Sequence, residues 1–220
     1  MRVDLHTHSV YSGDAAQTPA EMIAVAKRRG LDGIAITDHN TVEGGQVGRK
    51  LEKDFVISGI EVASSGGHIL ALGVSGPIPK NLSPQETVER IREEGGVAVA
   101  AHPYAPFRSG VGDEIKRVDF DAIEVLNAHL LSRNSKALRI CRRLGKPMSA
   151  GSDAHLPEEI GGAFVEAEVS SLEDLLECLR RGRVRIGGSL PSLWAELRSL
   201  AKKRMIKMRN FFRRLSSSGT

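Results

Sequence analysis

The chain has 220 residues, of which 40% are hydrophobic and 26% are charged, a composition typical of a globular domain. It has no run of 18 apolar residues, which excludes a membrane-spanning helix, and its first residues lack the apolar core of a signal peptide. We therefore expect a cytoplasmic protein with one hydrophobic core, large enough for a single catalytic domain. Cys141 and Cys178 lack metal-type spacing and are expected to be reduced thiols.

The net charge of +4 is unevenly distributed along the chain. Eight basic residues and no acidic residue follow residue 197, so removing these eight positive charges leaves residues 1–197 at −4. A mildly acidic body suits a site for cations, and bound divalent ions would in turn attract an anionic substrate. The sequence predicts two units, a barrel domain over residues 1–190 and a basic tail over residues 191–220.

Short apolar runs alternate with amphipathic stretches along the barrel domain. Strands are predicted over residues 3–5, 33–36, 55–60, 68–72, 97–101, 122–126, 147–150 and 163–165. Helices are predicted over residues 19–29, 41–52, 84–94, 134–144 and 172–181. Thr18-Pro19 and Ser83-Pro84 are typical helix starts, whereas Gly44-Gly45 and Gly66-Gly67 are expected to form turns. The alternation predicts an α/β fold with a mainly parallel sheet, either open or closed into a barrel.

Polar residues of a kind used in catalysis follow most of the predicted strands, which favours the barrel, because barrel enzymes collect catalytic groups at the carboxyl ends of their strands. His6 and His8 lie two apart on a predicted strand and project from the same face, a common way to hold one metal ion. Asp153 and His155 repeat this spacing after a later strand. The other candidate ligands are single residues near strand ends: Asp14, His39, Glu61, His68 and His102.

Imidazole and carboxylate groups together are the ligand set for zinc, manganese or iron. Nine candidate ligands exceed the needs of one ion, so the sequence predicts two or three divalent cations that share bridging carboxylates. Adjacent cations offer a bridging hydroxide as nucleophile and hold the oxygens of a phosphoryl group.

Several motifs resemble those of the PHP (polymerase and histidinol phosphatase) family. They are D-L-H-T-H-S at residues 4–9, I-T-D-H-N at 36–40, G-I-E at 59–61, G-H-I-L-A-L at 67–72, A-H-P at 101–103 and G-S-D-A-H at 151–155. The resemblance runs from residue 1 to about residue 190 and includes the ordered motifs of the family. Many members read Ser-Asp-Gly after the first motif, whereas here Gly13 precedes Asp14.

The resemblance implies a distorted seven-stranded β/α barrel with phosphoesterase activity and up to three metals. It places one metal on His6, His8, Glu61 and Asp153, a second on Glu61, His68 and His102, and a third on Asp14, His39 and His155. Only about 50 residues separate His102 from Asp153, so the chain lacks the capping insertion of relatives that hydrolyse AMP. We therefore expect an open site that admits a small phosphorylated substrate or the end of a nucleic acid.

Four residues are candidates for catalytic roles beside or beyond metal binding: Asp153, His155, Asp38 and Arg108. Asp38 either orients His39 or acts in general acid/base catalysis. Arg108 lies in a Pro/Gly-rich loop and either makes a bidentate contact to phosphate or is simply solvated. Either Glu124 or Asn127 is expected to face the site, and His129 is expected to lie in a loop or behind the ligands.

The basic tail places apolar residues at steps of three or four, from Trp194 to Leu215, opposite most of its basic residues, which predicts a C-terminal amphipathic helix. Its apolar stripe is expected to pack on the barrel or on a second subunit. Alternatively, the helix binds an anionic membrane surface or RNA.

The sequence as a whole predicts a metal-dependent hydrolase that cleaves a phosphomonoester or a nucleotide phosphodiester by a metal-bound hydroxide. The alternative is a non-catalytic metal-binding scaffold or accessory module, recruited through its tail. The number of candidate ligands favours the enzyme, because a scaffold has no need of so many.

Overall fold

The computed structural model describes residues 1–105, 110–128, 134–190, 202, 205–206 and 208. Its strands are β1 (Arg2–Thr7), β2 (Gly33–Ile36), β3 (Val56–Ser64), β4 (Gly67–Leu72), β5 (Val97–Ala100), β6 (Ala122–Asn127), β7 (Met148–Gly151), β8 (Ala163–Glu166) and β9 (Arg185–Gly188). Its α-helices are α1 (Pro19–Arg28), α2 (Glu43–Leu51), α3 (Pro84–Glu93), α4 (Asn134–Leu144) and α5 (Leu172–Arg180). Short 3-10 helices are η1 (Val10–Ser12), η2 (Gly112–Lys116) and η3 (Pro157–Glu159).

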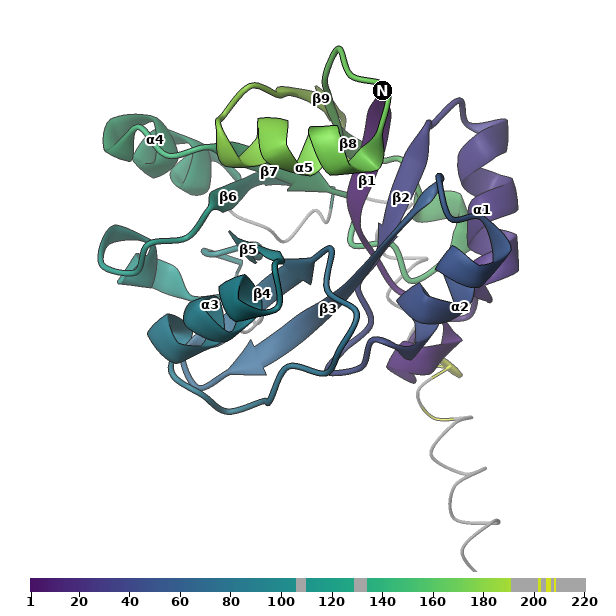
Figure 1. Cartoon of the computed structure of the whole chain (residues 1–220), viewed down its shortest axis with the longest axis horizontal. Helices are drawn as coiled ribbons and strands as arrows, with labels where there is room; N and C mark the ends of the chain where they lie inside the picture. The colour runs from purple at the N-terminus through teal and green to yellow at the C-terminus, as the bar shows by residue number, and fades with distance from the viewer. Residues whose placement is uncertain (106–109, 129–133, 191–201, 203–204, 207, 209–220) are drawn as a thin grey trace, which may run out of the picture.

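Five helices lie where the sequence predicts them, and local signals account for the starts of α1 and α3. Thr18 and Ser83 each accept a hydrogen bond from the N–H of a glutamate three residues later, and each glutamate side chain binds back to the cap. Pro19 and Pro84 occupy the first turn, where no N–H is needed. In Figure 1, α1 and α2 lie on one side of the ring of strands and α3 and α4 on the other.

The strands form one curved sheet in the order β7-β6-β5-β4-β3-β2-β1-β8-β9. The sheet has nine strands, so the expected number of seven is wrong. The additional strands, β8 and β9, pair antiparallel beside the first residues of β1. β9 was not predicted, because its sequence, Arg-Ile-Gly-Gly, has a single residue with strong β propensity.

The expectation of a mainly parallel sheet is also wrong. Four of the eight neighbouring pairs are antiparallel: β3 with β4, β4 with β5, β1 with β8 and β8 with β9. The reversal at β4 arises from a tight turn at Ser65-Gly66, which joins β3 and β4 as a hairpin. The predicted turn at Gly66-Gly67 is thus correct at Gly66, while Gly67 begins β4.

The sheet nearly closes, because the segment after β7 pairs with the last residues of β1. The N–H of Asp153 donates to the carbonyl of His6 at 2.7 Å, and the N–H of His8 donates to the carbonyl of Ala154 at 2.8 Å. Thr7 and Ala154 form a parallel bridge. β1 therefore has two partners on one edge, β8 near its start and residues 153–154 near its end.

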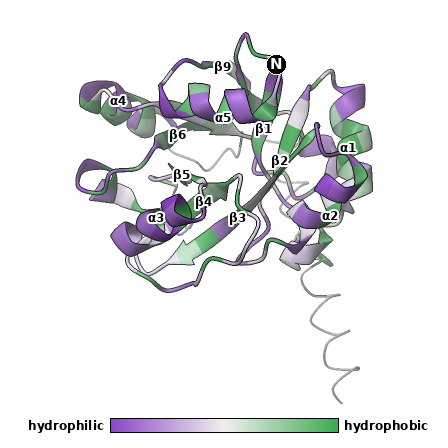
Figure 2. Cartoon of the chain, in the orientation of Figure 1, coloured by the Kyte–Doolittle hydropathy of each residue, from purple (hydrophilic) through white to green (hydrophobic). Residues whose placement is uncertain are grey.

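Hydrophobic side chains fill both the interior of the barrel and the layers beneath the helices. Inside, Val3, Leu5, Leu70 and Val99 are fully buried in a cluster that includes Leu175 of α5. α1 packs through Met22 and Ile23 on Ile34 and Ile36 of β2. Figure 2 shows the hydrophobic colour along β2 and a largely hydrophilic surface on α3. The barrel core therefore holds the strand ends in fixed positions.

Helix α2 approaches the sheet unusually closely through glycine. Gly44 and Gly45 belong to this helix, so the expectation that they form a turn is wrong. A Cβ atom on Gly45 would lie 2.9 Å from Cα of Ser58 on β3, and one on Gly48 would lie 2.8 Å from Cδ1 of Ile36. These glycines let the helix backbone lie directly on the strands.

The predicted C-terminal amphipathic helix falls almost wholly outside the described residues, and its packing stays a prediction. Lys202 forms an ion pair with Glu158 of η3. Within the described part of the chain, no helix has the length and apolar character needed to cross a membrane.

Candidate metal centre

The predicted ligands gather at one rim of the barrel. His6 is on β1, His8 and Asp14 follow it, and His39 follows β2. His102 follows β5, and Asp153 and His155 follow β7. His68 is near the start of β4, yet it reaches the same rim because β4 runs antiparallel to its neighbours.

Glu61 lies at the centre of this group. It is within β3, which continues to Ser64, and its side chain is 1% exposed. Its Oε1 lies 2.7 Å from Nδ1 of His68 and 2.9 Å from Nε2 of His102. Its Oε2 lies 3.0 Å from Nδ1 of His39, 3.3 Å from Nε2 of His8 and 3.4 Å from Nε2 of His6. One carboxylate thus faces five imidazoles.

The two aspartates complete the cluster from opposite sides. Oδ1 of Asp153 lies 3.4 Å from Nε2 of His8 and 3.6 Å from Nδ1 of His155. Asp14 places one oxygen 3.6 Å from Nε2 of His39 and the other 3.7 Å from Nε2 of His155. The exchange of Gly13 and Asp14 relative to many PHP members therefore still leaves a carboxylate beside both histidines.

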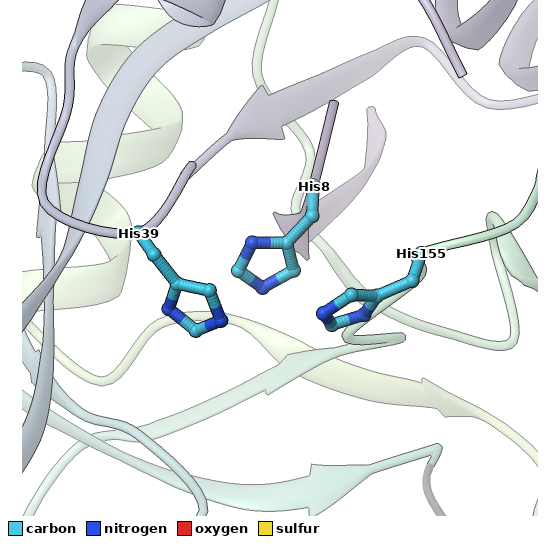
Figure 3. Close-up of side chains that lie close together, drawn as sticks. All are labelled: His8, His39 and His155. Atoms are coloured by element: carbon cyan, nitrogen blue, oxygen red, sulfur yellow. The ribbon is translucent and has the colours of Figure 1, made fainter. Parts of the chain in front are cut away.

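Figure 3 shows the rings of His8, His39 and His155 converging from separate segments of the chain. The ring centroids of His8 and His155 are 4.2 Å apart, and those of His8 and His39 are 4.6 Å apart. One ligand atom from each of these three residues lies within 4.8 Å of the others. Three further groups meet the same criterion: His6, His8 and Glu61; His6, His102 and Asp153; and His39, Glu61 and His68.

Polar atoms buried in the cluster lack hydrogen-bond partners within the described part of the chain. They are Nε2 of His6, Nε2 of His8, Oδ1 of Asp14 and Oε2 of Glu61. Leaving such atoms buried and unsatisfied costs about 1–3 kcal/mol each, which favours a bound ligand at the cluster. Imidazole and carboxylate donors suit zinc, manganese or iron, and the residues present therefore fit divalent metal ions.

The electrostatics of the cluster are those of a cation site. Burial disfavours a charged His6, but the carboxylates of Glu124 and Glu61 outweigh it and raise its pKa to about 10. Burial also opposes charge on His39, while Glu61 and Asp14 raise its pKa to about 10. Burial would raise the pKa of Glu61, but His39, His6 and His68 hold it well below its usual value. The carboxylates thus attract positive charge.

His8 and Asp14 both have lowered pKa values, for different reasons. Burial lowers the pKa of His8 to about 4, so this imidazole is neutral at pH 7 and has the form required of a metal ligand. Burial would raise the pKa of Asp14, but the neighbouring rings of His155 and His39 lower it far below its usual value. Asp14 is therefore a carboxylate at every physiological pH.

The other candidate residues either lie beside the cluster or fall outside the described residues. Both oxygens of Asp38 accept hydrogen bonds from Ser9, from its N–H at 2.6 Å and from its hydroxyl at 2.7 Å. Burial raises the pKa of Asp38. These contacts fit an orienting residue better than an acid or base. Arg108 and His129 lie outside the described residues, and the predicted roles of both stay predictions.

Sequence reasoning missed Ser12 and left open the choice between Glu124 and Asn127. The hydroxyl of Ser12 lies 3.1 Å from Nδ1 of His8 and accepts a hydrogen bond from the N–H of His39 at 3.0 Å. Glu124 is fully buried beside His6, and Asn127 donates to both Glu124 and Asp153. The predicted strand 122–126 pointed to both residues, but strand alternation alone could not assign their contacts.

A barrel whose rim gathers imidazoles and carboxylates around buried, unsatisfied ligand atoms defines a metal-dependent hydrolase. Comparison with known proteins agrees. Residues 4–101 match the PHP domain model, and residues 132–184 match the model described as PHP-associated. The chain belongs to the PHP family.

Relatives of known sequence and structure extend over most of the chain. An uncharacterized protein of Methanocaldococcus jannaschii is 44% identical over 142 residues, which cover 59% of this chain and 83% of that protein. A probable phosphatase of Caldicellulosiruptor saccharolyticus is 24% identical, with 82% of this chain and 96% of that one covered. The same fold occurs in a two-domain protein of Bacteroides vulgatus that contains a predicted PHP-like metal-dependent phosphoesterase, with a TM-score of 0.70 and 23% sequence identity. The match covers 92% of this chain and 69% of that one.

Proposed function

We propose that the chain hydrolyses a phosphate ester, either a phosphomonoester or a phosphodiester of a nucleotide or oligonucleotide. One observation carries the proposal: the buried carboxylate of Glu61 faces five histidines, and ligand atoms of this cluster have no hydrogen-bond partner in the described part of the chain. The resemblance to a probable phosphatase supports the choice of substrate class.

The proposed ligand sets follow from these contacts. His6, His8, Glu61 and Asp153 would hold one divalent ion, while Glu61, His68 and His102 would hold a second. The shared Oε1 of Glu61, within 2.9 Å of both His68 and His102, supports the second set. Asp14, His39 and His155 would hold a third ion, which the contacts of Asp14 to both histidines support.

Divalent ions at such a site neutralise charge on the phosphoryl oxygens and activate water as the nucleophile. The protein itself holds the ligand side chains in position and supplies their negative charge. Asp153 and His155 lie on the segment that closes the barrel, so their side chains are fixed at the rim by the pairing of residues 153–154 with β1. Asp38 anchors the start of η1 through Ser9 and is proposed to hold the loop that carries Asp14.

The proposed ligands differ in exposure, and this difference bears on the size of substrate that the site can admit. The side chains of His39, Asp14 and His68 are 27%, 28% and 21% exposed, whereas those of His6 and His8 are fully buried. These partly exposed ligands are proposed to line the entrance, and the stretch between His102 and Asp153 is too short to contain a large cap. This geometry suits a terminal phosphate on a larger molecule as well as a mononucleotide.

A substrate screen tests the proposal. Manganese-loaded protein is assayed for release of inorganic phosphate or of nucleotides with nucleoside monophosphates, nucleoside bisphosphates, short RNA, sugar phosphates and histidinol phosphate. We expect metal-dependent turnover of at least one class and none by the Asp153→Asn variant. Metal-loaded wild-type protein that turns over none of them, while binding two or three metals, would instead support a non-catalytic metal-binding scaffold.

A further inference from the structure

Glu124 is a buried carboxylate that the metal site leaves without a role. It is 1% exposed and lies on β6, beside the ligands but outside every ligand group. Its Oε2 accepts hydrogen bonds from two N–H groups, and its Oε1 faces a ring nitrogen of His6, so both oxygens act as acceptors. Three donors surround it, and two of them belong to proposed ligand residues.

The first donor is the ring of His6. Nδ1 of His6 lies 3.0 Å from Oε1 of Glu124, and Nε2 of the same ring lies 3.4 Å from Glu61 and 3.7 Å from Asp153. A carboxylate at Nδ1 requires a proton on that nitrogen. The lone pair of a neutral ring is then on Nε2, the atom that faces the other ligands.

The second donor is the backbone of His102, whose N–H donates to Oε2 of Glu124 at 2.6 Å. His102 has a φ of 27°, which is uncommon for a residue with a side chain and costs energy unless neighbouring contacts hold it. The hydrogen bond to Glu124 supplies such a contact. The ring of His102 is thereby aimed at Glu61 from a strained turn.

The third donor is Asn127, which extends the network to Asp153. Its side-chain N–H₂ donates to Oε2 of Glu124 at 3.0 Å and to Oδ2 of Asp153 at 3.3 Å. The backbone of Asn127 is fixed in turn by Asn134 at the start of α4, through two hydrogen bonds of 3.0 and 2.8 Å. Glu124 and Asn127 together contact three proposed ligand residues from separate segments of the chain: His6, His102 and Asp153.

We propose that Glu124 is a positioning residue that holds His6 with its proton on Nδ1 and fixes the backbone of His102, so that both rings present the nitrogen a metal requires. The inference rests on the proposed metal site. Glu124→Gln has nearly the same shape, but glutamine offers one oxygen to three donors. Two donors, the N–H of His102 and the amide of Asn127, lie on one side of residue 124, so the single oxygen of glutamine should face them. Its N–H₂ group then faces Nδ1 of His6. That contact favours the His6 tautomer with its proton on Nε2.

The first experiment compares metal affinity in three full-length proteins by calorimetric titration with Mn²⁺ and Zn²⁺. We expect Glu124→Gln to weaken at least one site by about 10- to 100-fold, the usual effect of losing a group that orients a ligand. The matched control is Asp121→Asn, just before β6 at the opposite end of the strand, where Asp121 accepts from the N–H of Ala98 and from Arg92. The Asp121→Asn control should bind both metals with wild-type affinity. Unchanged affinity in Glu124→Gln, or an equal loss in Asp121→Asn, overturns the proposal.

The second experiment needs no variant and decides the matter even where Glu124→Gln does not fold. In zinc-loaded wild-type protein with ¹⁵N-labelled histidine, the ring nitrogens of His6 report their state by NMR. We expect a protonated, hydrogen-bonded Nδ1 and a metal-bound Nε2. Metal on Nδ1 of His6 would overturn the role of Glu124 while leaving the metal site intact, whereas wild-type protein that binds no metal would overturn the proposed function as well.

Discussion

Glu61 shows how one side chain can organise a whole site. It sits on β3 where the strand passes the rim, between hydrophobic neighbours Ile60 and Val62 that are fully buried. Those neighbours point to the opposite face of the strand and hold it in the barrel, because side chains alternate along a strand. The packing of β3 and the charge of Glu61 are therefore separable.

This separation leads to a prediction for Glu61→Gln. Loss of the charge that faces five imidazoles should reduce bound metal and lower kcat/KM by at least about 10²-fold, the effect of losing one electrostatic contact to a transition state. Thermal unfolding should stay cooperative, because Ile60 and Val62 still pack. Elemental analysis, turnover and circular dichroism melting check these outcomes. Wild-type turnover in this variant would place the chemistry elsewhere.

The two cysteines are predicted to differ in reactivity. Cys141 is fully buried on α4, its thiol lies 3.2 Å from the carbonyl of Lys146, and burial raises its pKa to about 11. A raised pKa means less thiolate at any pH below 11, and the thiolate is the reactive form. Cys178 is only partly buried. At pH 8, a maleimide should therefore modify Cys178 first, leaving Cys141 until the protein unfolds.

Mass spectrometry of peptides after timed labelling measures this order, with Cys178→Ser as the control in which early labelling disappears. The same shift has a consequence for stability. The folded protein keeps the thiol proton to higher pH than the unfolded chain, so the contribution of Cys141 is fully present below pH 9 and falls as pH rises towards 11. Rapid labelling of Cys141 in the folded protein at pH 8 would contradict both statements.

Helix α2 depends on close contact between its glycines and β3. Gly45→Ala would place Cβ 2.9 Å from Cα of Ser58 and 3.1 Å from the backbone nitrogen of Gly59, atoms that cannot move aside. We expect this overpacking to reduce the free energy of unfolding by about 1–3 kcal/mol despite the better helix propensity of alanine.

Gly48→Ala is the matched comparison on the same face of α2. Its Cβ would meet Cδ1 of Ile36 at 2.8 Å and Cγ1 of Val56 at 3.0 Å, both side-chain atoms, which adjust more easily than backbone. Its effect should be smaller than that of Gly45→Ala. Urea denaturation of both variants measures the difference, and equal stabilities would contradict the close approach at Ser58.

The helices and the clustering of the candidate ligands could be predicted from the sequence because their signals are local. The caps at Thr18 and Ser83 and the pairs His6/His8 and Asp153/His155 need only spacing within a few residues. The direction of β4 could not be predicted with the same methods, because an apolar run reads the same for a parallel and an antiparallel strand. The contact of Glu124 with His6 joins residues 118 positions apart, which no local pattern encodes.

In the whole molecule, the candidate metal centre spans the place where the sheet closes, between β1 and the segment after β7. Its candidate ligands come from β1, β3, β4 and the segments after β1, β2, β5 and β7. A cation bound there would link β1 to the segment after β7, the pairing that closes the sheet. Metal binding should therefore stabilise the entire fold and not one loop.

Metal removal tests this coupling. Purified protein should contain two to three equivalents of transition metal, and chelation should lower Tm by roughly 10 °C, the effect of losing about 4 kcal/mol of binding free energy at free metal 1,000 times Kd. Re-addition of manganese should restore Tm. Coincident melting curves with and without metal, or metal content near zero after growth in its presence, would contradict a multinuclear centre.

The pairing of β1 with residues 153–154 also bears on the order of events during synthesis. A ribosome delivers His6 and His8 well before Asp153 and His155, so the emerging chain carries half of a chelating site on a strand whose outer edge still lacks its partner. Such an edge invites wrong pairing, and a half-built site binds metal weakly. We therefore expect metal to load only after β8 has left the exit tunnel, when both partners of this edge of β1 are present.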